Sequence, residues 1–163
     1  MIATSKLQDT ETLTKVDLLE PIRIFNLQKA NQQNIANTTA RERKEKLARL
    51  HQAVLRYRQE IKEALHQDFR KHPMEVDIAE IYKITSDIKH TRAHLSRWMR
   101  PRKVGTPLAQ LGTRSYIHYE PKGVVLIISP WNFPFNLTFG PLVSAIAAGN
   151  CAILKPSEMT PHS

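Results

Sequence analysis

The sequence has little of what secreted, metal-binding or membrane-spanning proteins need. One of its 163 residues is a cysteine, so it has no internal disulfide and no paired thiolates for a Cys-rich zinc site. Its most apolar stretch, residues 137–148, is well short of the roughly 18 residues that a membrane span requires. The N-terminus turns polar at once, without the apolar core of a secretory signal. These absences predict a cytoplasmic protein without a metal site.

Glycine and proline are also too few, at 5 and 10 residues, for a collagen-like or low-complexity chain. Hydrophobic residues make up 41% of the sequence, which is too much for a chain that stays disordered for want of burial. The length suits one globular domain of ordinary size.

Positive charge is concentrated in the middle of the chain. The net charge is +9, and residues 38–122 hold 19 basic and 10 acidic residues, so the whole excess lies there. A basic helical module that binds polyanions is one interpretation of this segment. Nucleic-acid binding also requires stacking aromatics or a groove-reading motif among the charges, and neither is visible. The mixed signs within residues 41–46 favour a solvated helix face instead, so we expect no nucleic-acid partner.

Residues 36–113 are predicted to be mainly helical, after a polar N-terminal extension at residues 1–35 whose order the sequence leaves open. Thr39 and Glu42 have the spacing of a capping box, which predicts a long helix from Thr39 until Pro73. Apolar residues recur in it every three or four positions and define one stripe. That stripe consists of Leu47, Leu50, Val54, Tyr57, Ile61, Leu65 and Phe69.

A second long helix is predicted up to Pro101, followed by a connector at residues 101–113. Its two-faced pattern predicts that it packs against the first helix or against a sheet. Asp87, His90 and His94 share one face, a spacing that could hold a metal, but two histidines without a fourth ligand are more typical of surface residues. The apolar stripe consists of Ile78, Ile81, Ile84, Ile88, Leu95 and Trp98.

The last third of the chain has the pattern of a βαβ unit. Residues 114–120 are β-branched and aromatic enough for a strand. Residues 124–128 are apolar without alternation, which predicts a strand buried on both faces of a parallel sheet. A short helix is expected at residues 141–148, closed by Gly149, and a second buried strand at residues 151–154. The fold class is therefore α/β, with two long helices followed by one βαβ unit of a parallel sheet at residues 123–163.

Two polar segments leave the two predicted parallel strands. In open α/β sheets ligands lie outside the carboxyl ends of the strands, and neighbouring parallel strands end at the same edge. Residues 129–134 and 155–158 should therefore lie side by side at one edge, although more than twenty positions separate them. A G-x-G-x-x-G fingerprint is missing, so the standard dinucleotide motif does not identify a ligand.

Four side chains of these segments could carry chemistry. Asn132 offers an amide donor and Trp131 an aromatic wall, whereas Lys155 offers a cation and Glu158 an acceptor for sugar hydroxyls. Each also fits an ordinary role: Asn132 can satisfy turn amides, Trp131 can belong to the core, and Lys155 can be solvated at a strand end. Their joint occurrence at one edge favours a site.

The motifs PKGVVLIISPWNFP, AAGN and LKPSE, in this order, resemble the aldehyde dehydrogenase superfamily. The resemblance covers about residues 40–163, and residues 135–138 are similar to the class 3-like branch, which oxidises fatty and aromatic aldehydes. It implies that the chain is the N-terminal part of the cofactor-binding domain. It also implies that residues 114–122 are the hairpin strand of the oligomerisation element, and that the full-length family member is a homo-oligomer (dimer).

The resemblance further implies an aldehyde substrate, NAD or NADP as cofactor, and a role for each motif position. Asn132 would donate to the oxyanion that forms when a cysteine thiolate attacks the aldehyde carbon. A carboxylate at Glu158 favours NAD, because the 2′-phosphate of NADP would meet a like charge, although this branch often accepts NADP. The implied cofactor-binding residues are Ser129, Pro130, Trp131, Asn132, Lys155, Ser157 and Glu158.

The family's cysteine nucleophile and glutamate general base have no counterpart in this sequence. Cys151 starts a predicted buried strand, where a free cysteine behaves as a small hydrophobe. We therefore expect the chain to belong to an NAD(P)-dependent aldehyde dehydrogenase that oxidises aldehydes to carboxylic acids, and to be inactive alone. The alternative is a non-catalytic truncated product that acts as an interaction module with an intact subunit.

Overall fold

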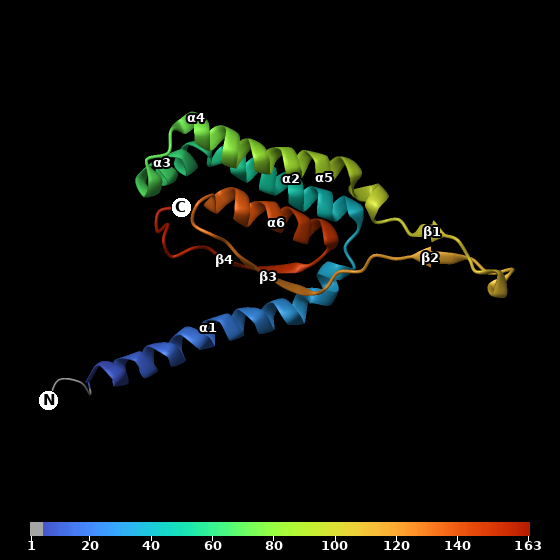
Figure 1. Ribbon diagram of the computed structural model, residues 1–163, viewed down its shortest axis with the longest axis horizontal. Coiled ribbons are helices and arrows are strands. Elements are labelled where there is room, and N and C mark those ends of the chain that lie inside the picture. The colour runs from blue at the N-terminus through green and yellow to red at the C-terminus, as the bar shows by residue number, and fades with distance from the viewer. Residues whose placement is uncertain (1–4) are drawn as a thin grey trace.

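The computed structural model describes the backbone of residues 5–163 and the side chains of residues 19–163. Figure 1 shows a layer of helices, a single helix beneath it, a two-stranded sheet, and a long N-terminal helix on the far side. A small hairpin projects from the layers. The elements are α1 (Ser5–Ala36), α2 (Ala40–Arg56), α3 (Arg58–Phe69), α4 (Pro73–Val76), the π-helix η1 (Asp77–Tyr82), α5 (Lys83–Trp98), β1 (Arg102–Val104), the 3-10 helix η2 (Leu108–Gln110), β2 (Ser115–Ile117), β3 (Val124–Ile128), α6 (Pro134–Ala148) and β4 (Cys151–Lys155).

The helical layer begins at the predicted capping box. The Glu42 amide donates to the Thr39 hydroxyl at 3.3 Å, and the Thr39 amide donates to the Glu42 carboxylate at 2.7 Å. Both predicted stripes then pack into one core between α2, α5 and α6, except for Tyr57, Ile78 and Trp98, which are exposed. The mixed charges on α2 pair along its solvated face, as Arg41 and Glu45 do at 2.9 Å.

Both predicted long helices differ from the observed ones. The first is interrupted at Tyr57, whose ψ of 17° ends α2 before α3 begins at Arg58. No proline or glycine marks this break, so no local signal predicts it. The second helix begins at Pro73 and contains the π-helical segment Asp77–Tyr82, in which one extra residue per turn changes the face that each side chain presents.

The βαβ unit is confirmed, with β3 and β4 parallel and Val124 paired with Cys151 through Ile128 paired with Lys155. The helix between them begins at Pro134 rather than at residue 141. Pro134 fits the first helical position, where its missing N–H is not needed, and Pro141 is accommodated inside the helix. Gly149 closes the helix in the left-handed region, with a φ of 82°, as predicted.

The prediction that the first strand is buried on both faces is wrong. Leu126 and Ile128 are 60% and 68% exposed, whereas Ile127 is buried. The reason is that α6 covers one face of the two-stranded sheet, and α1 on the other side leaves these two side chains uncovered. Among the described residues, nothing covers the rest of that face.

The N-terminal extension and the connector both contain structure that the sequence did not reveal. Residues 5–36 form α1, which contacts β4 and β3, whereas residues 1–4 lie outside the described residues. The strand expected at residues 114–120 is present as Ser115–Ile117, and it pairs antiparallel with Arg102–Val104 in the segment predicted to be a connector. None of the described helices combines the length and hydropathy of a membrane span.

Candidate functional site

The two predicted segments leave the sheet at the same edge. Ile128 pairs with Lys155 at the end of the ladder, and the Ser129 amide donates to the Lys155 carbonyl at 3.0 Å. Residues 129–134 and 155–158 therefore begin side by side, as the parallel topology requires. We call this edge the rim.

Lys155 and Glu158 form an exposed ion pair at the rim. The Lys155 ammonium donates to the Glu158 carboxylate, and this hydrogen bond lowers the pKa of Glu158 below its usual value. The side chains are 54% and 79% exposed, so both remain accessible to a ligand. Ser157, in contrast, is engaged in the turn itself, because its hydroxyl accepts from the Met159 amide at 3.2 Å.

Trp131 and Asn132 form the bend that follows β3. The Trp131 ring lies 6.0 Å from the Phe69 ring on α3, and 49% of this tryptophan is exposed, so it forms a wall rather than part of the core. The Asn132 side chain is exposed and has no hydrogen-bond partner among the described residues. The amide donor is therefore not consumed by the turn.

Ser129 lies at the rim through its backbone, but its side chain faces inward. The residue is buried, and its hydroxyl lies 2.6 Å from the Thr138 hydroxyl on α6. Pro130 beside it is exposed. Of the two, Pro130 alone therefore presents its side chain to the space outside the rim.

Two residues that sequence reasoning missed lie directly beneath the bend. The Lys71 ammonium donates to the Asn132 carbonyl at 2.7 Å and to the Glu80 carboxylate at 3.0 Å. The other oxygen of Glu80 accepts the Asn136 amide in the first turn of α6 at 2.7 Å. Glu80 is fully buried. Its negative charge is stabilised by the Lys71 ammonium and by the N-terminus of α6.

The end of α3 also contacts the residues that follow the second segment of the rim. Asp68 accepts the His162 amide at 3.2 Å and the Ser163 hydroxyl at 2.5 Å. Phe69 contacts Trp131, and Lys71 contacts Asn132, so one short segment joins the bend to residues 162–163. A left-handed Arg70, with a φ of 59°, makes the turn between them.

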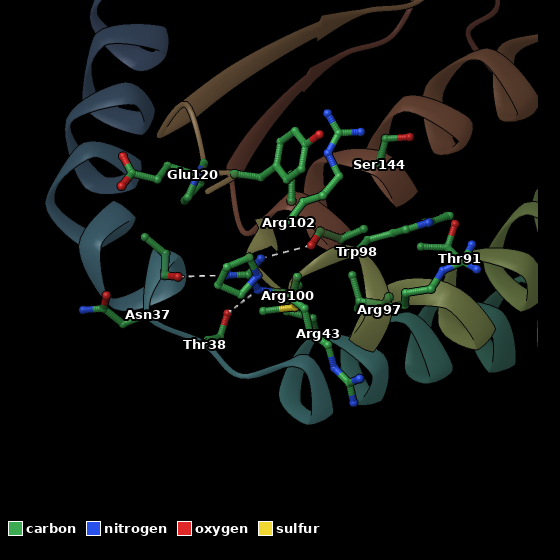
Figure 2. A pocket seen from close by; sticks show the side chains of 18 of the residues that line it. Asn37, Thr38, Arg43, Thr91, Arg97, Trp98, Arg100, Arg102, Glu120 and Ser144 are labelled. Atoms are coloured by element: carbon green, nitrogen blue, oxygen red, sulfur yellow. Dashed lines mark hydrogen bonds between the residues drawn. The ribbon is translucent and has the colours of Figure 1, made fainter. Parts of the chain in front are cut away.

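A hollow of about 1320 Å³ lies at the opposite end of the sheet, near the C-terminus of α6. Arg43 lines this hollow (Figure 2) and donates to the Thr38 hydroxyl at 3.0 Å, to the Ala147 carbonyl at 3.0 Å and to the Ala36 carbonyl at 2.8 Å. Arg43 is 5% exposed, and burial lowers the pKa of its guanidinium. It ties the ends of α1 and α6 to α2, which is a structural role.

The histidine face of the second helix has partners of its own. His94 Nδ1 lies 2.8 Å from the His90 carbonyl oxygen, the two rings are 4.3 Å apart, and Asp87 accepts from Lys83 at 3.0 Å. Within the part of the chain that the structure describes, no three His, Cys, Asp or Glu side chains are placed to hold a metal ion.

Three comparisons agree on what the chain is similar to. The sequence profile described as "Aldehyde dehydrogenase family" matches residues 12–163. The 4,4'-diaponeurosporen-aldehyde dehydrogenase of Staphylococcus aureus is 48% identical over 74% of this chain, and aldehyde dehydrogenase family 3 member B1 of Bos taurus is 44% identical over 65% of it. The solved substrate-bound Staphylococcus aureus AldH matches 85% of the chain with 44% identity and a TM-score of 0.81. The chain spans 26% of the first relative, 23% of the second and 30% of the solved structure.

Proposed function

The chain belongs to the aldehyde dehydrogenase family, and on this premise we propose that it supplies the oxyanion donor and the cofactor rim of an NAD(P)-dependent enzyme that oxidises aldehydes to carboxylic acids. The family 3 relatives support the class 3-like branch. The activity itself is a proposal, because the chain spans less than a third of these relatives.

The observation that carries the proposal is the side-chain amide of Asn132 at the rim, which is free of partners among the described residues. It lies on the segment that leaves the sheet beside the one that carries the Lys155–Glu158 pair. When a thiolate attacks an aldehyde carbon, a C–S bond forms and the carbonyl oxygen takes up negative charge. The Asn132 Nδ2 would donate to that oxygen. A donor of this kind acts on charge that develops in the transition state, and losing it costs about a hundredfold or more in rate.

The hydrogen-bonding groups of the rim suit the adenosine end of a nicotinamide dinucleotide. The Glu158 carboxylate, with its lowered pKa, is ionised at neutral pH and can accept from two ribose hydroxyls, with Lys155 beside it. Pro130 and Trp131 would line the nicotinamide side. The cofactor, when bound, supplies the hydride acceptor for the oxidation.

Glu158 also bears on the choice of cofactor. A 2′-phosphate would meet its negative charge, so NAD should be preferred over NADP. E158Q should narrow the difference between the Kd of NAD and the Kd of NADP, with the main effect on NADP. An unchanged ratio of the two Kd values would show that Glu158 does not contact the ribose.

The proposal places the nucleophile and the general base outside these 163 residues. Cys151 is buried at the start of β4, the end of that strand opposite Lys155, so its thiol does not reach the rim. The chain alone should therefore give no NAD(P)H from a medium-chain aldehyde. Its cytoplasmic location and its homo-oligomeric state are proposals of the same kind.

The test uses this chain joined to the remaining sequence of the Staphylococcus aureus relative, which we call the joined enzyme. The joined enzyme should form NADH, and N132A should lower its kcat by about a hundredfold or more. N136A is the matched control, because the Asn136 side chain has no hydrogen-bond partner among the described residues. A sustained rate from the 163-residue chain alone, or an N132A rate equal to that of N136A, would overturn the proposal.

A second candidate function is an interaction module that pairs with an intact subunit. The β1–β2 hairpin favours it, because the hairpin projects from the layers and its loop carries Leu108 and Leu111, which are almost fully exposed. Co-purification of the chain with a full-length relative would support this function. A chain that stays monomeric and unbound in that mixture would contradict it.

A further inference from the structure

A buried ion pair lies beneath the bend that carries the proposed oxyanion donor. Lys71 and Glu80 come from the α3–α4 connection and from η1, and both are nearly or fully buried. A buried carboxylate and ammonium are costly to desolvate, so their contacts must be specific to be tolerated. Apart from the bond between them, the hydrogen bonds that their side chains make among the described residues go to Asn132 and Asn136.

These contacts grip both ends of the bend. The Lys71 ammonium donates to the Asn132 carbonyl at 2.7 Å and lies 4.3 Å from the centroid of the Phe133 ring. Glu80 accepts the Asn136 amide at 2.7 Å, four residues further along. One charged pair therefore fixes the carbonyl before α6 and an amide in its first turn, which sets the path of the chain through Asn132.

Charge compensation alone does not account for this geometry. Glu80 would be neutralised equally well by a lysine that had no contact with Asn132. Lys71 instead divides its donors between the carboxylate and the bend, and the Phe69 ring lies 5.1 Å from its ammonium on another side. Phe69 in turn meets Trp131, so the same support reaches the neighbouring residue of the bend.

We propose that Lys71, held by Glu80, is a positioning residue that fixes the main chain at Asn132 so that its side-chain amide is directed at the developing oxyanion. This inference rests on the proposed function, because it assigns Lys71 a role through Asn132. The π-helical turn has a purpose in this account, since it places Glu80 against the N-terminus of α6.

The first arm of the test uses the 163-residue chain. K71M/E80Q removes both charges, so that no buried carboxylate is left without a cation. Hydrogen exchange of the backbone amides within residues 132–136, above all that of Asn136, which donates to Glu80, should quicken at least about tenfold, while α2 and α5 keep their protection. K83M is the matched control, because Lys83 pairs with Asp87 on an exposed helix face. Unchanged exchange at residues 132–136 would overturn the proposal.

The second arm measures kcat and KM in the joined enzyme. A pair that only stabilises the fold would lower kcat equally with and without the Asn132 side chain, or would not lower it. K71M/E80Q should lower kcat between about tenfold and a hundredfold with little change in KM, because a small misplacement of a catalytic group has this effect. The same change in the N132A background should have little further effect on kcat. K71R alone keeps a cation beside Glu80, so its kcat should lie between that of K71M/E80Q and that of the unchanged joined enzyme. Equal losses in both backgrounds, or full kcat in K71M/E80Q, would overturn the proposal.

The two arms also separate this inference from the proposed function. If N132A keeps the kcat of the joined enzyme, the proposed function fails and the positioning role fails with it. If N132A loses kcat and K71M/E80Q does not, the proposed function stands and the positioning role alone is wrong.

Discussion

The two ends of the parallel sheet each hold a buried cation, and the two cations are used differently. At the starts of the strands, Arg43 donates to the oxygens of Thr38, Ala36 and Ala147, and no carboxylate lies within ion-pair distance of it among the described residues. At the rim, Lys71 has a buried carboxylate partner and contacts the bend before α6. One end uses its polar groups to join helices, whereas the rim leaves Asn132, Lys155 and Glu158 accessible to a ligand.

In our proposal, the Arg43 end serves folding and the rim serves binding. The hollow beside Arg43 has a volume of about 1320 Å³, yet its buried charge is already committed to three protein oxygens. The rim instead presents exposed groups that, in our proposal, match the chemistry of an oxyanion and a ribose.

The largest expected effect on the free energy of unfolding comes from replacing Arg43, at the starts of the strands. R43M should lower the free energy of unfolding by about 3–5 kcal/mol, because it leaves buried carbonyls at the ends of α1 and α6 without a donor. Urea unfolding measures this change. R41M is the control, since Arg41 forms an exposed pair with Glu45, and it should cost less than about 1 kcal/mol. Equal losses in R43M and R41M would remove the structural role of Arg43.

For the buried Lys71–Glu80 pair, removing one charge should have a different effect on stability from removing both. K71M leaves the buried Glu80 carboxylate without its cation and should cost about 3 kcal/mol of unfolding free energy, whereas K71M/E80Q should cost much less. The comparison of the two midpoints in urea measures the penalty of the orphaned charge. If the single and the double variant are equally stable, the pair does not act as a unit.

A smaller effect is expected at Gly149, which joins α6 to β4 over Arg43. G149A should cost about 1–3 kcal/mol, because the residue has a φ of 82° and an added Cβ would collide with the Arg43 guanidinium. In R43M/G149A part of this loss should disappear, since the collision is relieved. Additive losses in the double variant would show that the backbone conformation alone matters there.

The smallest effect concerns Asp77, a partly exposed residue of η1, the π-helix that also contains Glu80. Hydrogen bonds from Arg58, and then from Lys62, lower its pKa to about 2. Because the pKa is lower in the folded chain, the contribution is fully present above about pH 4 and is lost as the pH falls through about 2. D77N should therefore lower stability by less than about 1 kcal/mol at neutral pH and flatten the acid dependence between these values. An unchanged acid profile in D77N would contradict this assignment.

Local signals in the sequence predicted the parts of the fold that local interactions determine. The capping box at Thr39, the bounds of β3 and the left-handed cap at Gly149 are all present as predicted. The adjacency of the two rim segments followed from parallel topology alone. The motif resemblance identified the family, and the profile match confirmed it.

The parts that could not be predicted depend on partners far away in the sequence. Nothing local marks the break at Tyr57 or the π-helical turn, and Lys71 reaches Asn132 across 61 positions. The exposure of Leu126 and Ile128 depends on how many elements cover the sheet, which a run of apolar residues does not show. The supporting residues of a site are therefore harder to predict than the residues that face its ligand.

The central claim, that the rim and not the hollow is the functional end, is tested most directly by hydrogen–deuterium exchange of the joined enzyme with and without NAD. We expect slower exchange at residues 129–134 and 155–158 when NAD is bound, with no change around Arg43 and residues 97–102. Protection confined to the Arg43 end, with the rim unaffected, would contradict it.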